Sequence, residues 1–100
     1  MKYKITGHVN TREVFMNGLQ ISPYSSLKVI NHSPDGFNWG YGGSGPAQLA
    51  LAILMHGCEN EGIAIDHAVR SYQKFKEDHI VHLNIDQDFE IEVYLEEYLK

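Results

Sequence analysis

The stretch GYGGSGPAQLALAIL, residues 40–54, joins a glycine-rich run to an almost wholly apolar one. Pro46 suits the first turn of a helix, because the N–H that it lacks would have no partner there. Gly45 then becomes the expected N-cap, and Gln48 lies where its amide can reach back to that cap. Because the residues after Pro46 are apolar nearly all round, the stretch predicts a central buried helix over about 46–57.

The residues before this helix predict a small N-terminal antiparallel sheet. Segment 2–9, KYKITGHV, alternates apolar and polar side chains as a half-buried strand does. In segment 13–22, EVFMNGLQIS, Asn17 and Gly18 suit a two-residue type I′ turn, which needs positive φ at both positions. Two apolar pairs then face each other across the hairpin: Met16 with Leu19, and Val14 with Ile21. The short apolar piece 27–30 predicts either a further edge strand or an extended entry into the next loop.

The residues after the central helix predict a second helix and a mixed C-terminus. Apolar side chains recur at three- and four-residue steps over about 66–83, which predicts an amphipathic helix opened by Asp66. Residues 89–93 alternate like a strand, whereas the apolar residues of 91–99 equally fit a helix. We expect a short strand through Ile91 and then a short C-terminal helix. The predicted fold class is therefore α+β, with the sheet packed on the central helix.

The composition limits the class of protein. One hundred residues, 43% hydrophobic and 21% charged, suit one folded unit, so residues 1–100 are expected to form a single compact domain. The net charge of −5 argues against nucleic-acid binding, which depends on Lys and Arg. No stretch reaches the roughly 20 apolar residues that cross a bilayer, and the N-terminus has no secretory apolar region. With Cys58 as its only cysteine the chain forms no internal disulfide, which fits a reducing cytoplasm. From the charge, the apolar content and the cysteine count together, we expect a cytoplasmic protein that binds neither nucleic acid nor membrane.

The glycines of the loop formally spell G-x-G-x-x-G at Gly40, Gly42 and Gly45, the outline of a dinucleotide-binding turn. However, the run before Gly40 is not a buried strand, and the chain is too short for the parallel sheet of that fold. No Gly-Lys-Ser/Thr follows the glycines. The sequence therefore predicts neither a Rossmann fold nor a P-loop.

A small anionic or nucleotide-like ligand at the start of the helix is the first functional hypothesis. Helix N-termini present unpaired N–H groups and a partial positive charge. Trp39 and Tyr41 lie close enough in sequence to stack on a planar ring, and Asn31 or His32 would hold the loop open. The predicted ligand-binding residues are Asn31, His32, Trp39, Tyr41, Gly43, Ser44, Gly45 and Ala47. The alternative, favoured by the frequency of structural glycine turns, is that the glycines permit tight packing while the aromatic rings fill the core.

An acidic, partner-binding surface is the second hypothesis. Residues 86–97 hold six of the thirteen acidic residues and no basic one. Such a run usually forms a solvated, solubilising face. In the sharper interpretation, Asp88, Glu90 and Glu92 dock on a basic surface of a host protein. The chain would then be an effector, such as a phage- or plasmid-encoded inhibitor of a host defence system.

No constellation of residues predicts an enzyme, a metal site or a cofactor. His79-x-x-His82 lacks a third ligand at a suitable spacing. Cys58 lacks the flanking pattern of an activated thiol. The polar residues of 31–35, NHSPD, lie too close together for a catalytic triad, whose members converge from separate segments. They predict a tight turn instead.

The run NHSPDGFNWGYGGSGPAQLALAIL, residues 31–54, resembles the signature of an uncharacterised family of small bacterial, phage and plasmid proteins, a domain of unknown function. The similarity extends to YQKFK at 72–76, to the hairpin region 14–21 and loosely to the C-terminal FEI…EEYL. The resemblance implies a compact domain from bacteria and their mobile elements, and it makes 31–54 the place to look for function. It implies no catalytic residue.

Overall fold

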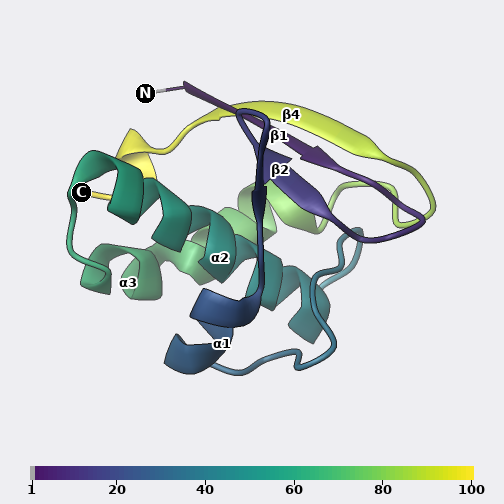
Figure 1. Ribbon diagram of the computed structural model, residues 1–100, viewed down its shortest axis with the longest axis horizontal. Helices are drawn as coiled ribbons and strands as arrows, with labels where there is room; N and C mark the ends of the chain where they lie inside the picture. Colours follow the sequence, from purple (N-terminus) through teal and green to yellow (C-terminus); the bar gives the residue numbers. More distant parts are fainter. Residues whose placement is uncertain (1) are drawn as a thin grey trace.

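A four-stranded antiparallel sheet lies across one side of a layer of helices in the computed structural model, which describes residues 2–100 (Figure 1). The elements in chain order are β1 Lys2–Gly7, β2 Val14–Met16, β3 Leu19–Ile21, α1 Tyr24–Val29, α2 Ser44–Glu61, α3 Asp66–Phe75, the π-helical turn η1 Lys76–Ile80, β4 Phe89–Tyr94 and the 3-10 turn η2 Glu96–Tyr98. The fold is α+β, as predicted. No helix within residues 2–100 is long and apolar enough to cross a membrane.

The N-terminal hairpin has the predicted turn and register. Asn17 and Gly18 have φ values of 50° and 82°, as a type I′ turn requires. Val14 pairs with Ile21 and Met16 with Leu19 across the two strands. This register buries the inward-facing side chains of β2 against α2, because alternate residues of a strand point to opposite faces.

The prediction of an extended segment at 27–30 is wrong, because the residues after β3 form helix α1. The Ser22 hydroxyl accepts a hydrogen bond from the Tyr24 amide, and Pro23 already has a helical φ of −69°. The carbonyl of Pro23 also accepts a hydrogen bond from the Ser26 hydroxyl. Ser22 and Pro23 thus start a helix that is too short for its apolar residues to show a helical period in the sequence.

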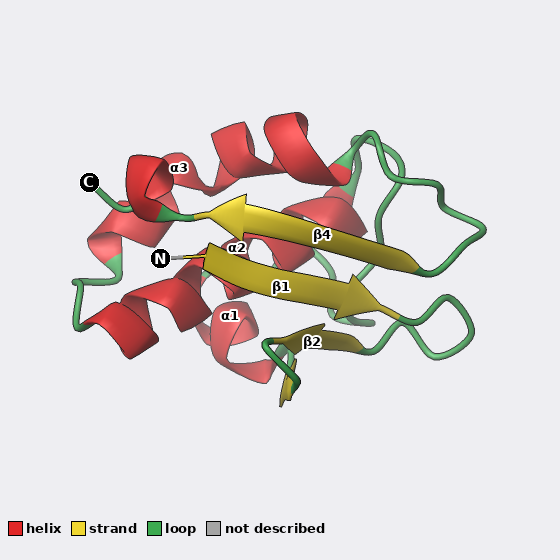
Figure 2. Ribbon diagram, turned by 90° about the horizontal axis from the view of Figure 1, so that it is seen from above, coloured by secondary structure: helices red, strands yellow, loops and turns green. Residues whose placement is uncertain are grey.

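The last strand, β4, comes from the C-terminal end of the chain and pairs with β1, giving the sheet order β3-β2-β1-β4 (Figure 2). It runs through Tyr94, beyond the predicted end at Ile91, and the expected C-terminal helix is only the turn η2. Every residue of β4 from Phe89 onward has a partner in β1. This ladder outweighs the helical spacing of the same residues, because tertiary pairing overrides weak local propensity.

The central helix α2 is buried on nearly all sides, as predicted, but it is longer than the expected 46–57. It begins at Ser44 and ends before Gly62, whose left-handed φ of 68° closes the helix. Gly57, the expected end, lies inside the helix, where an added Cβ would come within 2.8 Å of the Leu95 side chain. This glycine therefore serves the close approach of the C-terminal segment.

Helix α3 opens at Asp66 as predicted and ends at Phe75, so the predicted helix over 66–83 is too long. The chain continues through one π-helical turn to Ile80 and then leaves the helix. Phe75 and Ile80 are both fully buried. A π-helical turn brings residues five apart onto one side, which explains why both side chains reach the core.

Candidate functional site

The signature segment, residues 31–54, places its tryptophan in the core. Trp39 is fully buried, and its indole N–H lies 3.2 Å from each of the carbonyl oxygens of Asn84 and Gln87. Its ring meets Phe89 edge-on, and the Arg12 guanidinium covers it with 4.6 Å between the guanidinium carbon and the ring centroid. Trp39 cannot stack on a ligand in this conformation. Its predicted role as a ligand-stacking residue is therefore corrected to a core position.

Tyr41 lies outside the core, with its ring over the glycines of the loop. The side chain is 40% exposed. A Cβ added to Gly43 would come within 2.2 Å of the Tyr41 ring, and one added to Gly45 within 2.5 Å of the Asn38 Cβ. Gly40 has a φ of +85°, which favours glycine. The glycines are thus explained by close packing and backbone conformation, the structural alternative to a ligand loop.

The start of α2 differs from the prediction by two residues. Gly43, rather than Gly45, precedes the helix, and the Ala47 amide donates to the Gly43 carbonyl at 3.1 Å. Ala47 is therefore not a free donor. The amides of Ser44 and Gly45 have no partner within the helix, as at any helix start, and Ser44 is exposed while Gly45 is buried. Of the predicted ligand-binding set, Ser44 and Tyr41 combine exposure with a position at the helix start.

Gln48 is fully buried and joins α2 to the chain around α1. Its Oε1 accepts hydrogen bonds from the amides of His32 at 2.7 Å and Ser33 at 3.0 Å. Its Nε2 donates to the Ser26 hydroxyl at 2.8 Å and to the Ile30 carbonyl at 3.1 Å. Gln48 therefore holds this segment to α2 and does not cap the helix, which corrects its predicted role.

His32 also anchors this segment to the helices. The prediction that it holds the glycine loop open is wrong. Its Nε2 lies 2.7 Å from the Tyr72 hydroxyl oxygen, which ties the segment to α3. Asn31, its predicted companion, is an exposed residue at the start of this segment. The tight turn expected nearby is present, with the Gly36 amide donating to the Ser33 carbonyl.

The predicted acidic surface is largely paired within the sheet. The Asp88 carboxylate accepts a hydrogen bond from the Val9 amide at 2.6 Å. Two ion pairs join the neighbouring strands: Lys4 with Glu90 at 3.7 Å, and Lys2 with Glu92 at 3.5 Å. The outer face of β1 and β4 therefore carries mixed charge, which weakens the case for docking on a basic partner there.

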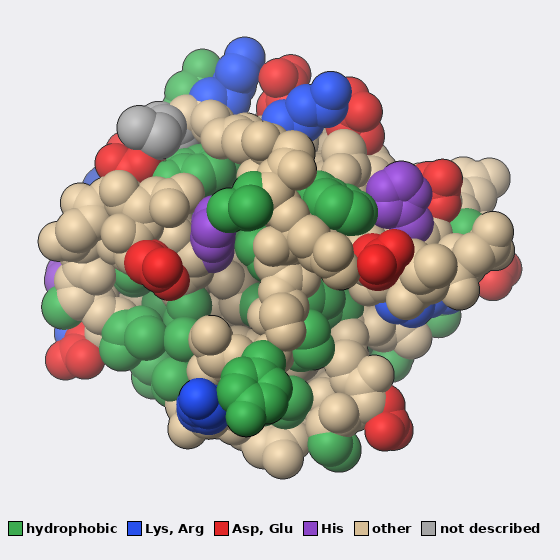
Figure 3. Space-filling model, in the orientation of Figure 1, with side chains coloured by type: hydrophobic (Ala, Val, Ile, Leu, Met, Phe, Trp, Pro, Cys, Tyr) green, Lys and Arg blue, Asp and Glu red, His purple; other side chains and the backbone are tan. Residues whose placement is uncertain are grey.

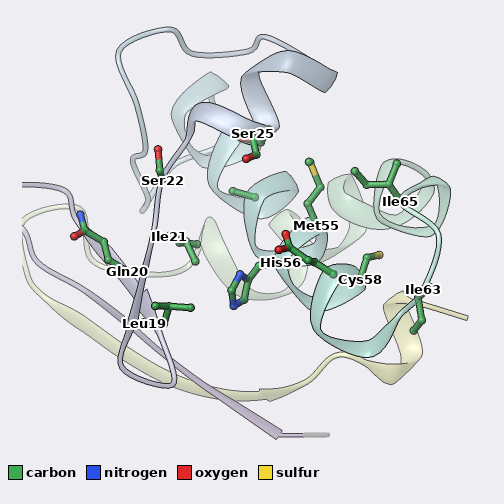
Figure 4. A pocket seen from close by; sticks show the side chains of 13 residues that line it. Leu19, Gln20, Ile21, Ser22, Ser25, Met55, His56, Cys58, Ile63 and Ile65 are labelled. Carbon is green, nitrogen blue, oxygen red and sulfur yellow. The ribbon is translucent and has the colours of Figure 1, made fainter.

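A groove of about 470 Å³ opens between β3, α1 and the end of α2 (Figure 4). Strand β3 forms one wall, α2 lies along the middle and the segment from α2 to α3 forms the far side. Its apolar lining includes Leu19, Ile21, Met55, Cys58, Ile63 and Ile65. On this face of the molecule, hydrophobic side chains gather between α1 and the start of α3 (Figure 3). None of these residues was predicted as functional, because they are scattered along the chain and form no motif.

The groove is lined at the α2 end by the carboxylate of Glu59 and the imidazole of His56. Glu59 lies exposed on its rim and takes part in no ion pair among residues 2–100. The last turn of α2 holds no basic residue, so nothing there offsets the partial negative charge of the helix C-terminus. No Lys or Arg is among the described residues that line the groove.

Cys58 lies beside the groove with a buried side chain. Burial raises the pKa of the Cys58 thiol, which favours its protonated form. Its sulfur lies 3.5 Å from the Ala64 carbonyl oxygen, to which the thiol donates.

A cluster of titratable groups lies where α3 and η1 meet the C-terminal segment. The Asp78 carboxylate accepts hydrogen bonds from the Lys74 ammonium at 2.8 Å and the Tyr98 hydroxyl at 2.7 Å, and these bonds lower the Asp78 pKa. Burial lowers the pKa of the neighbouring His79. Within residues 2–100, no group of three or more His, Cys, Asp and Glu side chains is placed to hold a metal ion. This cluster ties η1 to the C-terminal segment.

The fold and the groove define a small α+β protein with an open, mainly apolar groove at one edge of its sheet. The chain belongs to a family of unknown function, DUF6166, whose model matches residues 4–96. No curated protein and no solved structure matches it significantly.

Proposed function

We propose that this protein is a non-enzymatic binding module that holds another protein in the groove between β3, α1 and the end of α2. The exposure of two large apolar side chains carries the proposal: Leu19 and Ile65, in opposite walls, are 61% and 40% exposed. Exposed apolar side chains beside a hollow are typical of interaction sites. The proposal keeps the protein-partner hypothesis and moves the contact from the acidic strand to the groove.

The shape of the groove favours a polypeptide over a small molecule. Small-molecule sites usually enclose their ligand and present a few convergent polar groups. This groove is open along the whole of β3, and its exposed hydroxyls, Ser22 and Ser25, lie in different walls. The Ser26 hydroxyl deeper in the groove is already bonded to Pro23 and Gln48. The other polar lining residues, Gln20, His56 and Glu59, are spread over β3 and α2 and do not converge on one point. Such an extended surface suits the side chains of a bound polypeptide.

The test is to pan a phage library of random linear peptides against the immobilised protein. The groove variant combines Leu19→Glu with Ile65→Glu, two exposed positions whose change leaves the core intact. The matched control is Tyr94→Glu, a residue as exposed as Leu19 on the opposite edge strand. We expect enriched clones that bind the wild type and the control but not the groove variant. Clones that bind the groove variant as well as the wild type, or a library from which no clone is enriched, would contradict the proposal.

A small anion at the start of α2 is the second candidate, supported by the exposed Ser44 beside the exposed ring of Tyr41. Phosphate or a nucleotide there would raise the melting temperature, and the rise would grow with ligand concentration. Thermal unfolding with added phosphate, AMP or ATP tests it, with Ser44→Ala as the variant that should lose the response. An unchanged melting temperature with all three ligands removes this candidate.

A further inference from the structure

Strand β3 presents an unpaired backbone edge along the groove. It is an end strand of the sheet, bonded on one side to β2 only. On either side of β2, the amide of Asn17 donates to the Lys4 carbonyl and the Glu13 carbonyl accepts from the His8 amide, so the backbone N–H and C=O groups of odd-numbered residues face β1. Phe15 follows the same alternation, and its partner across the hairpin is Gln20. The N–H and C=O of Gln20 therefore point away from β2, toward the open edge.

A strand added at this edge would meet a wall built for alternate side chains. Side chains along an extended chain point to opposite faces, so every second one of an added strand faces the helices. The lining on that side runs from Ile21 on β3 across His56 and Met55 on α2 to Ile63 and Ile65 beyond it, and most of it is apolar. Edge-strand addition draws its affinity from backbone hydrogen bonds and its specificity from pockets for these alternate side chains.

The charge of the groove favours a partner segment that carries a positive charge. Glu59 has no ion-pair partner among residues 2–100, and the uncompensated C-terminus of α2 lies beside it. The described lining residues include no Lys or Arg, and the one histidine among them, His56, has its Nε2 3.2 Å from the side-chain nitrogen of Asn60. A Lys or Arg on the partner is the complement of this end of the groove.

We infer that the groove binds an extended peptide segment of a partner protein, which pairs with β3 at Gln20, inserts alternate apolar side chains and places a basic residue against Glu59. The inference rests on the proposed function and adds the conformation and the charge of the bound segment. An exposed edge strand presents backbone N–H and C=O groups to which another chain can add, and β3 has neither a proline nor a lysine to block such pairing.

The test starts from the groove-dependent phage clones and uses their most enriched peptide in synthetic form. Binding is measured by isothermal titration calorimetry at low salt against the wild type and Glu59→Lys. The matched control is Glu97→Lys, another exposed glutamate, which lies in η2 away from the groove. We expect alternating apolar residues with one Lys or Arg in the clones, and a Kd about three- to tenfold weaker for Glu59→Lys only, as reversal of an exposed charge pair produces. A peptide with that basic residue changed to Glu should recover affinity for Glu59→Lys.

A second peptide tests the strand pairing. Single N-methylation along the backbone removes one donor at a time, and we expect the position whose N–H donates to the Gln20 carbonyl to abolish binding while its two neighbours have little effect. Groove-dependent clones that are acidic, or peptides that tolerate N-methylation everywhere, would overturn the inference and leave the proposed function standing. Self-association of the wild type in sedimentation, lost in the groove variant, would also overturn it, because the occupant would then be a second copy. Absence of any groove-dependent clone overturns both.

Discussion

The signature segment and the groove differ in where their side chains point. Residues 31–48 hold most of the features that suggest chemistry, yet Trp39 and Gln48 are fully buried and bonded within the chain. The groove has no recognisable motif, yet it leaves Leu19 and Ile65 exposed beside a hollow. A distinctive motif can therefore mark the residues that a fold needs, while the surface available for binding is made of ordinary ones.

The same comparison explains what sequence reasoning can find. Features carried by adjacent residues were predicted: the Asn17-Gly18 turn fixes the hairpin register, and a long apolar run fixes the buried helix α2. Features that depend on tertiary contacts were missed or misplaced. The role of Gln48 was misplaced because its partners, Ser26, Ile30, His32 and Ser33, come from a segment 15 or more residues away, which no local rule contains. Helix α1 was missed because its signals, Ser22 and Pro23, are turn residues as well as helix starters.

The largest effect is expected at Trp39. Trp39→Ala removes a fully buried ring and leaves a cavity, so we expect the free energy of unfolding to fall by about 3–5 kcal/mol. Urea unfolding followed by circular dichroism measures the loss. Tyr41→Ala, the exposed ring of the same segment, should cost about 1 kcal/mol or less. Equal losses of unfolding free energy at the two positions would contradict the distinction between buried and exposed residues of the signature segment.

Gln48 is expected to come next. Gln48→Ala leaves the amides of His32 and Ser33, together with the Ile30 carbonyl, without their side-chain partner. Unsatisfied buried groups cost about 1–3 kcal/mol each, partly relieved by water, so we expect a loss of about 2–4 kcal/mol in the same unfolding assay. Gln73→Ala, an exposed glutamine on α3, is the control and should change stability by about 0.5 kcal/mol at most. A neutral Gln48→Ala would show that this segment is not held by the helix.

The loop glycines give a smaller and more specific effect. An alanine at Gly45 meets the Cβ and the backbone nitrogen of Asn38, so Gly45→Ala should cost about 1–3 kcal/mol. Gly42→Ala has no atom within 4 Å of its new Cβ and should be nearly neutral. Melting temperatures of the two variants separate packing from ligand binding. A stable Gly45→Ala would reopen the interpretation of this loop as an open site.

His79 provides a pH test outside both regions. Burial lowers its pKa, so the folded protein binds the proton less well than the unfolded chain does. Stability from this group is complete above the ordinary histidine pKa of about 6.5 and is lost as the pH falls through and below it. We expect His79→Phe to reduce the loss of stability between pH 7.5 and pH 5, measured by thermal unfolding at each pH. An identical pH profile for both proteins would show that His79 is not buried in its neutral form.

The groove should tolerate substitution with the smallest effect on folding. Leu19→Glu changes an exposed side chain at the open edge, so the free energy of unfolding should move by about 0.5 kcal/mol or less. The same unfolding assay measures it. A loss comparable to that of Gln48→Ala would place Leu19 in the core and remove the distinction between the two regions.

The claim that the signature segment builds the core is tested most directly by acrylamide quenching of the fluorescence of Trp39, the single tryptophan. Because its indole is fully buried, the quenching constant of the native protein should be several times smaller than that of the protein unfolded in urea. Native quenching as strong as in the unfolded chain would place the indole in solvent. The signature would then be an open surface, and the assignment of binding to the groove would lose its foundation.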